Sequence, residues 1–71
     1  MFSKEIFSER IKYLRCKKNV KQSDVAEAVG ITNRQISMME TGQRGPSAEV
    51  LCALADYFGV SLDYLTGRCD R

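Results

Sequence analysis

The sequence predicts an all-α fold, a compact single domain of five short helices, and three observations lead to this prediction. Apolar residues recur at helical spacing in five separate segments. A side chain that caps helices precedes most of these segments, and glycine follows most of them. The alternation of polar and apolar residues that is typical of a half-buried strand does not occur, and the sequence has no internal repeat.

The first predicted helix covers residues 4–18 and has Ser3 as its N-cap. Its buried side is predicted from apolar residues at helical spacing, namely Phe7, Ile11, Leu14 and then Val20. The second helix covers about 22–29 and stops at Gly30, since glycine readily takes the left-handed conformation that closes a helix. Its buried side is marked by Val25, Ala26 and Val29.

The third predicted helix starts after Thr32, which forms a capping box with Gln35, and ends at Glu40 or Thr41. Its buried side is marked by Ile36 and Met39. Residues 42–46, with two glycines and a proline, are predicted to form a loop.

The fourth predicted helix follows Ser47 and closes at Gly59, and the fifth follows Ser61 and closes at Gly67. The fourth is expected to bury Ala48, Leu51, Leu54, Ala55 and Phe58. The fifth is expected to turn Leu62 and Leu65 inward. The core of the domain, residues 1–71, therefore covers about 4–67, and residues 68–71 are predicted to be a frayed tail.

Composition indicates an ordinary globular domain. The chain has 71 residues, of which 44% are hydrophobic and 28% charged, which argues against a disordered or membrane chain. The N-terminus lacks the pattern of a signal peptide, and no apolar stretch approaches the ~20 residues of a membrane span. We expect a cytoplasmic protein with no membrane partner.

Little in the sequence supports catalysis, so we do not expect an enzyme. There is no histidine, no glycine-rich phosphate loop and no carboxylate pair in an evident cleft. Cys16, Cys52 and Cys69 are odd in number and share no close spacing, which favours isolated reduced thiols and predicts neither a metal site nor a disulfide framework. A thiol-based metal or redox sensor is the alternative. No cofactor is expected.

Charge is distributed unevenly along the chain. Residues 1–44 contain nine Lys and Arg against five Asp and Glu, whereas residues 45–71 contain two against four. The first part therefore carries +4 and the second −2. This polarity would direct the N-terminal part toward a polyanion, although solvation of exposed helix faces explains it equally well.

The second and third helices are joined by about three residues that include Gly30, a spacing typical of a helix-turn-helix. Helices that cross so closely need a small residue where their backbones meet, apolar residues on the buried side and a permissive residue in the turn. These requirements are met by Val25, Ala26, Val29, Gly30, Ile31, Ile36 and Met39.

The run QSDVAEAVGITNRQISMME resembles the helix-turn-helix of the lambda repressor-like family, the Cro-type or XRE-type regulators. All seven framework positions given above match that family's pattern. The run FSERIKYLR resembles the family's first helix, and RGPSAEVLCALADYFGVSLDYL resembles its fourth and fifth helices. The resemblance covers roughly residues 7–67 and implies a five-helix DNA-binding domain.

In this family the third helix docks in the major groove of DNA, and the second helix lies across the backbone. By resemblance, the residues of the third helix that contact bases are Asn33, Arg34, Ser37 and Met38. We expect Arg34 to donate hydrogen bonds to guanine and Asn33 to pair with adenine. Ser37 can hydrogen-bond several base edges, and Met38 can make an apolar contact with a thymine methyl. For each of them a solvated side chain is the alternative.

The resemblance also assigns contacts to the DNA backbone. Gln22 matches a glutamine that touches phosphate and braces the recognition helix, and it is also a candidate for base contact. The other expected phosphate contacts are Lys21, Thr32, Gln35, Thr41, Gln43 and Arg44. Arg15 and Glu40 match a pair that often forms a salt bridge from the first helix to the end of the third, so we assign them a structural role.

Three residues depart from the family pattern. Asn19 replaces the usual glycine after the first helix, and asparagine is the next best residue for a left-handed position. Lys21 replaces a Ser or Thr cap and places a positive charge at the positive end of a helix dipole, which suggests that it reaches a phosphate. Met38 stands where a basic or polar residue is more usual, which favours an exposed apolar contact to DNA or to a partner.

The resemblance predicts a sequence-specific transcriptional regulator, a repressor, that binds double-stranded DNA at a palindromic operator as a homodimer. The dimer surface is expected on the fourth and fifth helices at Tyr57, Tyr64 and the outer side of Leu65, unless the two tyrosines only complete the core. The alternative function is a protein-interaction module, such as an antitoxin, that retains this fold.

Overall fold

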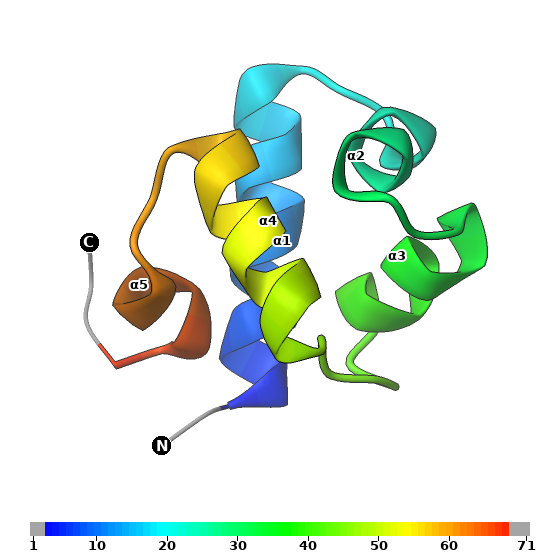
Figure 1. The fold of residues 1–71 in the computed structure, drawn as a ribbon. Coiled ribbons are helices and arrows are strands. Elements are labelled where there is room, and N and C mark those ends of the chain that lie inside the picture. Colours follow the sequence, from blue (N-terminus) through cyan, green and yellow to red (C-terminus); the bar gives the residue numbers. More distant parts are fainter. Residues whose placement is uncertain (1–2, 69–71) are drawn as a thin grey trace.

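The computed structural model describes residues 3–68, and no strand occurs in that range. The chain forms five helices, α1 (Lys4–Lys18), α2 (Gln22–Val29), α3 (Asn33–Glu40), α4 (Ala48–Phe58) and α5 (Leu62–Thr66), arranged as Figure 1 shows. The predicted fold class and the bounds of all five helices are confirmed.

Local capping explains why the helices begin where they do. Ser3, Thr32, Ser47 and Ser61 are N-caps in extended backbone, and each side-chain oxygen accepts a hydrogen bond from the backbone N–H three residues later, at 3.0 to 3.3 Å. Each cap satisfies an N–H that has no partner inside its helix. Only α2 begins without such a side-chain bond.

Left-handed residues end four of the helices. Gly30, Gly59 and Gly67 close α2, α4 and α5, and Asn19 closes α1 with φ 60°. After α1, the N–H groups of Asn19 and Val20 donate to Cys16 O and Arg15 O, both at 3.1 Å. These two hydrogen bonds pair carbonyl groups of the last helical turn. The expected left-handed conformation of Asn19 is therefore confirmed.

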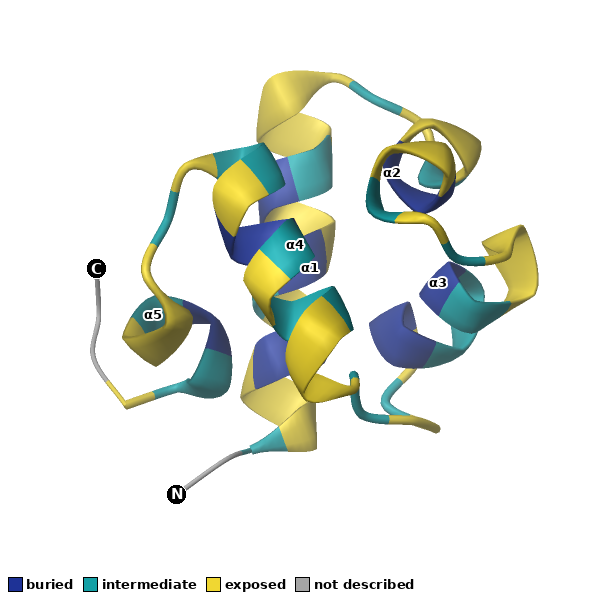
Figure 2. Cartoon of the chain, in the orientation of Figure 1, coloured by how far each residue is buried: buried dark blue, intermediate teal, exposed yellow. Residues whose placement is uncertain are grey.

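The hydrophobic core lies between α1 and the other helices. Helix α1 packs against α3 and α5, α2 packs against α3 and α4, and α4 packs against α5. Buried residues occur on the inner side of every helix (Figure 2). The largest fully buried side chains are Phe7, Ile11, Val25, Ile36, Leu54 and Leu65.

Three expectations about burial in α4 and α5 are wrong. Ala48 is exposed because it is the first residue of α4, one turn before the part of that helix that reaches the core. Leu62 is 43% exposed, whereas Leu65 is fully buried. Leu62 is the first residue of α5 and lies at the end of the helix, whereas Leu65, nearly one turn later on the same side, reaches the core. Leu65 therefore has no exposed outer side, and the expected contribution of that side to a dimer surface is wrong.

The two ends of the described chain are tied to α5. The Ser3 N–H donates to Thr66 O at 3.3 Å, and the Arg68 N–H donates to Asp63 O at 2.8 Å. The remainder of the predicted tail, including Cys69, lies outside the described residues. Cys16 and Cys52 are free and exposed. Within residues 3–68 no helix is long and apolar enough to cross a membrane, and no group of three or more potential metal ligands occurs.

Candidate nucleic-acid interface

The connection between α2 and α3 is a tight turn that the backbone itself stabilises. Gly30 has φ 78°, and the N–H groups of Gly30 and Ile31 both donate to Ala26 O at 2.9 Å. Ala26 is 3% exposed, and Val25 and Ile36 are fully buried beneath the junction. A larger side chain at position 26 would separate the two helices, so these residues hold α3 at a constant angle to α2.

The outward side of α3 carries the predicted base contacts. Asn33 and Arg34 are exposed, and neither side chain has a partner within the described part of the chain. Ser37 and Met38 are half-buried, so Met38 is less exposed than its predicted role suggests. The four residues lie in the first two turns of one helix and can approach the base edges of a groove together.

The predicted capping box at the start of α3 is confirmed. Thr32 Oγ1 accepts from the Gln35 N–H at 3.1 Å, and Gln35 Oε1 accepts from the Thr32 N–H at 2.9 Å. The box occupies the amide oxygen of Gln35 and leaves its NH₂ group to donate. An NH₂ group is the part of this amide that suits a phosphate oxygen.

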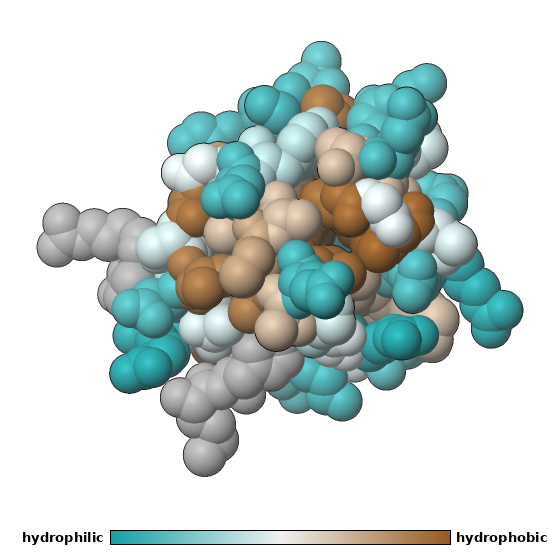
Figure 3. Space-filling view, viewed as in Figure 1, coloured by the Kyte–Doolittle hydropathy of each residue, from teal (hydrophilic) through white to brown (hydrophobic). Residues whose placement is uncertain are grey.

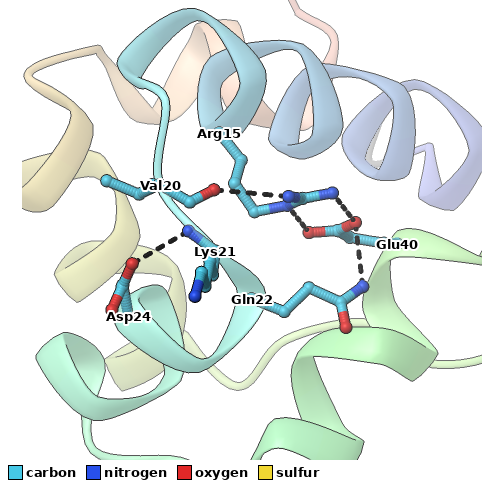
Figure 4. A network of polar contacts seen from close by, with 6 residues as sticks. All are labelled: Arg15, Val20, Lys21, Gln22, Asp24 and Glu40. Atoms are coloured by element: carbon cyan, nitrogen blue, oxygen red, sulfur yellow. Dashed lines mark hydrogen bonds and ion pairs between the residues drawn. The ribbon is translucent and has the colours of Figure 1, made fainter.

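Arg15 and Glu40 form the predicted salt bridge between α1 and the end of α3 (Figure 4). Arg15 Nε donates to Glu40 Oε2 at 2.7 Å and Nη2 donates to Oε1 at 3.1 Å, a bidentate arrangement. The hydrogen bond with Glu40 raises the pKa of Arg15 above its ordinary value. Glu40 is 3% exposed, so its carboxylate depends on this partner.

Gln22 joins the same network from α2. Its Nε2 donates to Glu40 Oε1 at 3.2 Å, and Arg15 Nη1 donates to Val20 O at 3.3 Å. The carbonyl oxygen of Gln22 points away from Glu40 (Figure 4). One buried carboxylate therefore connects α1, α2 and the end of α3. The bracing role predicted for Gln22 has a direct structural basis, and its amide oxygen can still accept a bond.

Asp24 stabilises the start of α2, and the sequence reasoning missed it. Lys21 is the N-cap, but an ammonium group cannot accept a bond from the helix N–H groups. Asp24 Oδ2 instead accepts from the Lys21 N–H at 2.9 Å and places a negative charge in the first turn. An acid three residues after the cap is the signal that could have revealed it. The Lys21 side chain makes no capping bond, and Lys21 is exposed.

The first three residues of the loop after α3 use their backbone amides internally. The N–H groups of Thr41 and Gln43 donate to Ser37 O at 3.1 Å and Met38 O at 3.0 Å. Thr41 Oγ1 also donates to Met38 O at 3.1 Å. The amides of Thr41 and Gln43 are therefore already paired, whereas the exposed side chains of Gln43 and Arg44 are available to meet a phosphate.

Comparison with known proteins agrees with this geometry. The family model described as Helix-turn-helix matches residues 11–65, which include all of α2 and α3. The chain belongs to the lambda repressor-like, XRE-type helix-turn-helix family. Members of this family are DNA-binding domains of transcriptional regulators.

Two curated relatives illustrate the family's range. The chain is 40% identical over 60 residues to the HTH-type transcriptional regulator AnsR of Bacillus subtilis, a match that covers 84% of this chain and 52% of AnsR. It is 32% identical over 54 residues to the uncharacterized regulator MJ0272 of Methanocaldococcus jannaschii, covering 76% of this chain and 82% of MJ0272. The chain thus spans about half the length of AnsR.

Solved structures share the arrangement of helices. The P22 c2 repressor, in a crystal structure with synthetic operator 9T, superposes with a TM-score of 0.82 at 35% identity, covering 84% of this chain and 91% of that one. The restriction-modification controller protein C.AhdI of Aeromonas hydrophila gives 0.80 at 26% identity, covering 87% and 94%. The five-helix arrangement is therefore that of repressor DNA-binding domains.

Proposed function

We propose that this chain is a sequence-specific double-stranded DNA-binding transcriptional regulator, a repressor, that reads the major groove with α3. The observation that carries the proposal is the division of α3 into two sides. Its inner side is buried against α1 and α2, whereas Asn33 and Arg34 extend into solvent without partners in the described chain. The P22 c2 repressor, which has the same fold, is known in complex with an operator.

Base contacts in this proposal follow from side-chain chemistry. Arg34 donates to both acceptors of a guanine, and Asn33 pairs with an adenine. Ser37 reaches whichever base edge is nearest, and Met38 contacts a thymine methyl with the part of its side chain that is exposed. Gln22 reaches the DNA with its amide oxygen or its remaining N–H while its bond to Glu40 is kept.

Contacts to the DNA backbone surround this reading surface. Lys21 and Arg44 supply the positive charges, at the start of α2 and in the loop after α3. Neutral side chains between them supply the donors that are still free, namely the NH₂ group of Gln35, the second N–H of the Gln22 amide and the amide of Gln43. The hydroxyls of Thr32 and Thr41 already donate to Gln35 Oε1 and Met38 O, so they reach a phosphate only by exchanging those bonds. Such contacts set the position of α3 on the duplex without reading its sequence.

A homodimer on a palindromic operator completes the proposal, because two half-sites one helical turn apart require two copies of α3. Tyr57 and Tyr64 are half-buried against the core, so only part of each side chain is available to the predicted dimer surface. Figure 3 shows apolar side chains gathered over α4 and its neighbours. We place the pairing surface there and include the exposed Leu62 of α5 in it.

Selection of bound sequences from random duplex DNA tests the proposed function. We expect enrichment of a palindrome whose half-sites contain a G·C pair, with an affinity that falls steeply as salt rises. Failure to enrich any sequence would contradict sequence-specific binding and favour a protein-interaction module.

Arg34→Ala tests the base contact directly. Because Arg34 is exposed, the variant should keep the thermal stability of the parent chain. Its affinity for the selected site should fall by about 1 to 3 kcal/mol, roughly 5- to 150-fold, with discrimination lost at one base pair. Arg68→Ala is the matched control, because Arg68 is also exposed but lies after α5. Equal loss of affinity on all sequences would assign Arg34 to phosphate instead.

A further inference from the structure

A groove lies where the C-terminal half of α1 meets the connection between α4 and α5. It has a volume of about 430 Å³, and its walls include Tyr13, Lys17 and Tyr64. It continues into a neighbouring hollow of about 330 Å³ that shares Leu14, Lys17 and Val60. We call the two hollows together the α1–α5 groove. None of the described residues that line it belongs to α2 or α3.

The floor of the α1–α5 groove is apolar and its rim is basic. Leu14, Phe58 and Val60 supply aliphatic and aromatic surface, and Lys17 and Lys18 stand at the edge. No Asp or Glu is among the described residues that line either hollow. An occupant that complements this surface carries negative charge around an apolar side chain.

Cations already cover two tyrosine rings that line this groove, Tyr13 and Tyr64, and the ring of Tyr57, which packs against the lining residue Phe58. Arg10 Cζ lies 4.4 Å from the centroid of the Tyr64 ring, Lys18 Nζ lies 5.2 Å from that of Tyr57, and Lys17 Nζ lies 5.8 Å from that of Tyr13. Single-stranded nucleic acid binds by stacking successive bases on open aromatic faces. Because cations occupy one face of each of these rings, the groove suits a peptide better than unpaired bases.

We propose that the α1–α5 groove binds a short acidic peptide segment of a partner protein. An aliphatic side chain of the segment packs on Leu14 and Val60, and flanking carboxylates pair with Lys17 and Lys18. In Figure 1, α5 and the α4–α5 connection lie on the opposite side of the molecule from α3. The partner therefore binds without covering the outward side of α3, and this inference does not depend on the proposed DNA binding.

The test measures binding of the full chain to a fluorescein-labelled peptide of Asp and Glu residues around a central Leu. The comparison peptide has Asn and Gln in place of the acids. We expect at least about tenfold tighter binding of the acidic peptide, and a loss of about tenfold or more in Lys17→Glu, since a reversed charge turns attraction into repulsion. Amide chemical shifts of Leu14 and Val60 should move on titration.

Lys12→Glu is the matched control, because Lys12 is an exposed lysine of α1 that does not line the groove. Its affinity for the acidic peptide should stay within about twofold of the parent, since an exposed charge away from the contact is screened by salt. Circular dichroism establishes that both variants are folded.

Several outcomes would overturn the proposal. Equal binding of the neutral peptide would remove the role of charge, and equal loss in Lys12→Glu and Lys17→Glu would reduce it to nonspecific attraction. Displacement of the peptide by an oligo-dT strand would assign the groove to nucleic acid. Self-association that Lys17→Glu abolishes would assign it to a second copy of this chain.

Discussion

At the scale of single residues, Glu40 connects more of the domain than any other polar side chain that the structure describes. Its carboxylate receives three hydrogen bonds, two from Arg15 and one from Gln22. Glu40 is the last residue of α3, whereas Arg15 lies in α1 and Gln22 in α2. These bonds therefore hold the C-terminal end of α3 in place against both other helices. A buried charge in this position stabilises the fold only while its partner is present.

Arg15→Met should therefore be strongly destabilising. It leaves the buried Glu40 carboxylate without its cation, and breaking such a pair from one side costs about 3 to 5 kcal/mol. The Arg15 side chain is 22% exposed, so we expect the low end, about 3 kcal/mol, in the free energy of unfolding measured by urea denaturation. Arg15→Met with Glu40→Met should recover at least about half of that loss. No recovery in the double variant would contradict this account of the pair.

The pH dependence of the pair follows from the direction of its pKa shift. Glu40 raises the pKa of Arg15 in the folded state. The stabilisation from charged Arg15 is therefore complete below its unfolded pKa and is lost only as pH rises through the folded value, at strongly alkaline pH. Between neutral pH and moderately alkaline pH, the stability gap between the parent and Arg15→Met should stay constant.

Lys21→Ser should raise stability and lower DNA affinity together. Lys21 has the extended backbone of an N-cap, so a serine there can accept the bond that lysine cannot, stabilising α2 by about 0.5 to 1 kcal/mol. If Lys21 neutralises a phosphate, affinity falls and the slope of log K against log salt becomes shallower by about 1. Lys12→Ser is the control. A stabilised variant with unchanged affinity and salt dependence would show that Lys21 does not contact DNA.

At the scale of helices, residues near each end encode the start and stop of the element. Each of four N-caps accepts from a residue three positions along, and the left-handed residues pair carbonyls within the preceding turn. These interactions need no distant partner. The bounds of all five helices could therefore be predicted from the sequence. This includes α2, whose N-cap Lys21 is unusual but whose end is marked by Gly30.

Asn19 offers a clean test at this scale, because it is the only residue other than glycine with positive φ in the described chain. Asn19→Ala should lower stability by about 1 kcal/mol, since alanine has a steric penalty in left-handed backbone. For a domain of this size the loss corresponds to a drop in Tm of about 4 to 8 °C. Asn19→Gly should leave Tm nearly unchanged or raise it. Equal Tm values for the alanine and glycine variants would mean that α1 ends differently in solution.

At the scale of the whole molecule, separate parts of the surface have separate chemistry. The outward side of α3 exposes Asn33 and Arg34, and apolar side chains gather near the middle of the face that Figure 3 shows, over α4 and its neighbours. The α1–α5 groove is apolar with a basic rim. The proposed DNA contacts on α3 and the proposed peptide groove therefore lie on different parts of the surface, so binding at one leaves the other accessible.

Salt dependence tests the proposed assembly. The proposed charged phosphate contacts of one protomer are Lys21 and Arg44, and together they predict a slope of log K against log salt of about −2 on a half-site. A dimer on a palindrome should show about twice that slope. Fluorescence anisotropy with half-site and palindromic duplexes measures both. Equal slopes would mean that one protomer binds each duplex, and the proposed pairing through α4 and α5 would fail.

Part of the candidate site could also be predicted from the sequence. The capping box of Thr32 and Gln35 and the pair of Arg15 and Glu40 are formed as expected, the first because it is local and the second because the family resemblance supplied it. The half-burial of Met38 and the role of Asp24 were not predicted. The roles of Asn33, Arg34, Ser37 and Lys21 on DNA stay predictions.

The fold class, the helix bounds and the helix-turn-helix of residues 22–40 could be derived from the sequence, because caps, turns and helical periodicity act between residues a few positions apart. The packing of the helices was needed to bury Leu65 and expose Leu62, to join Gln22 to Glu40 and to bring Tyr13 and Val60 together in one groove. Those outcomes depend on how separate helices pack, and packing is a property of residues far apart in the chain.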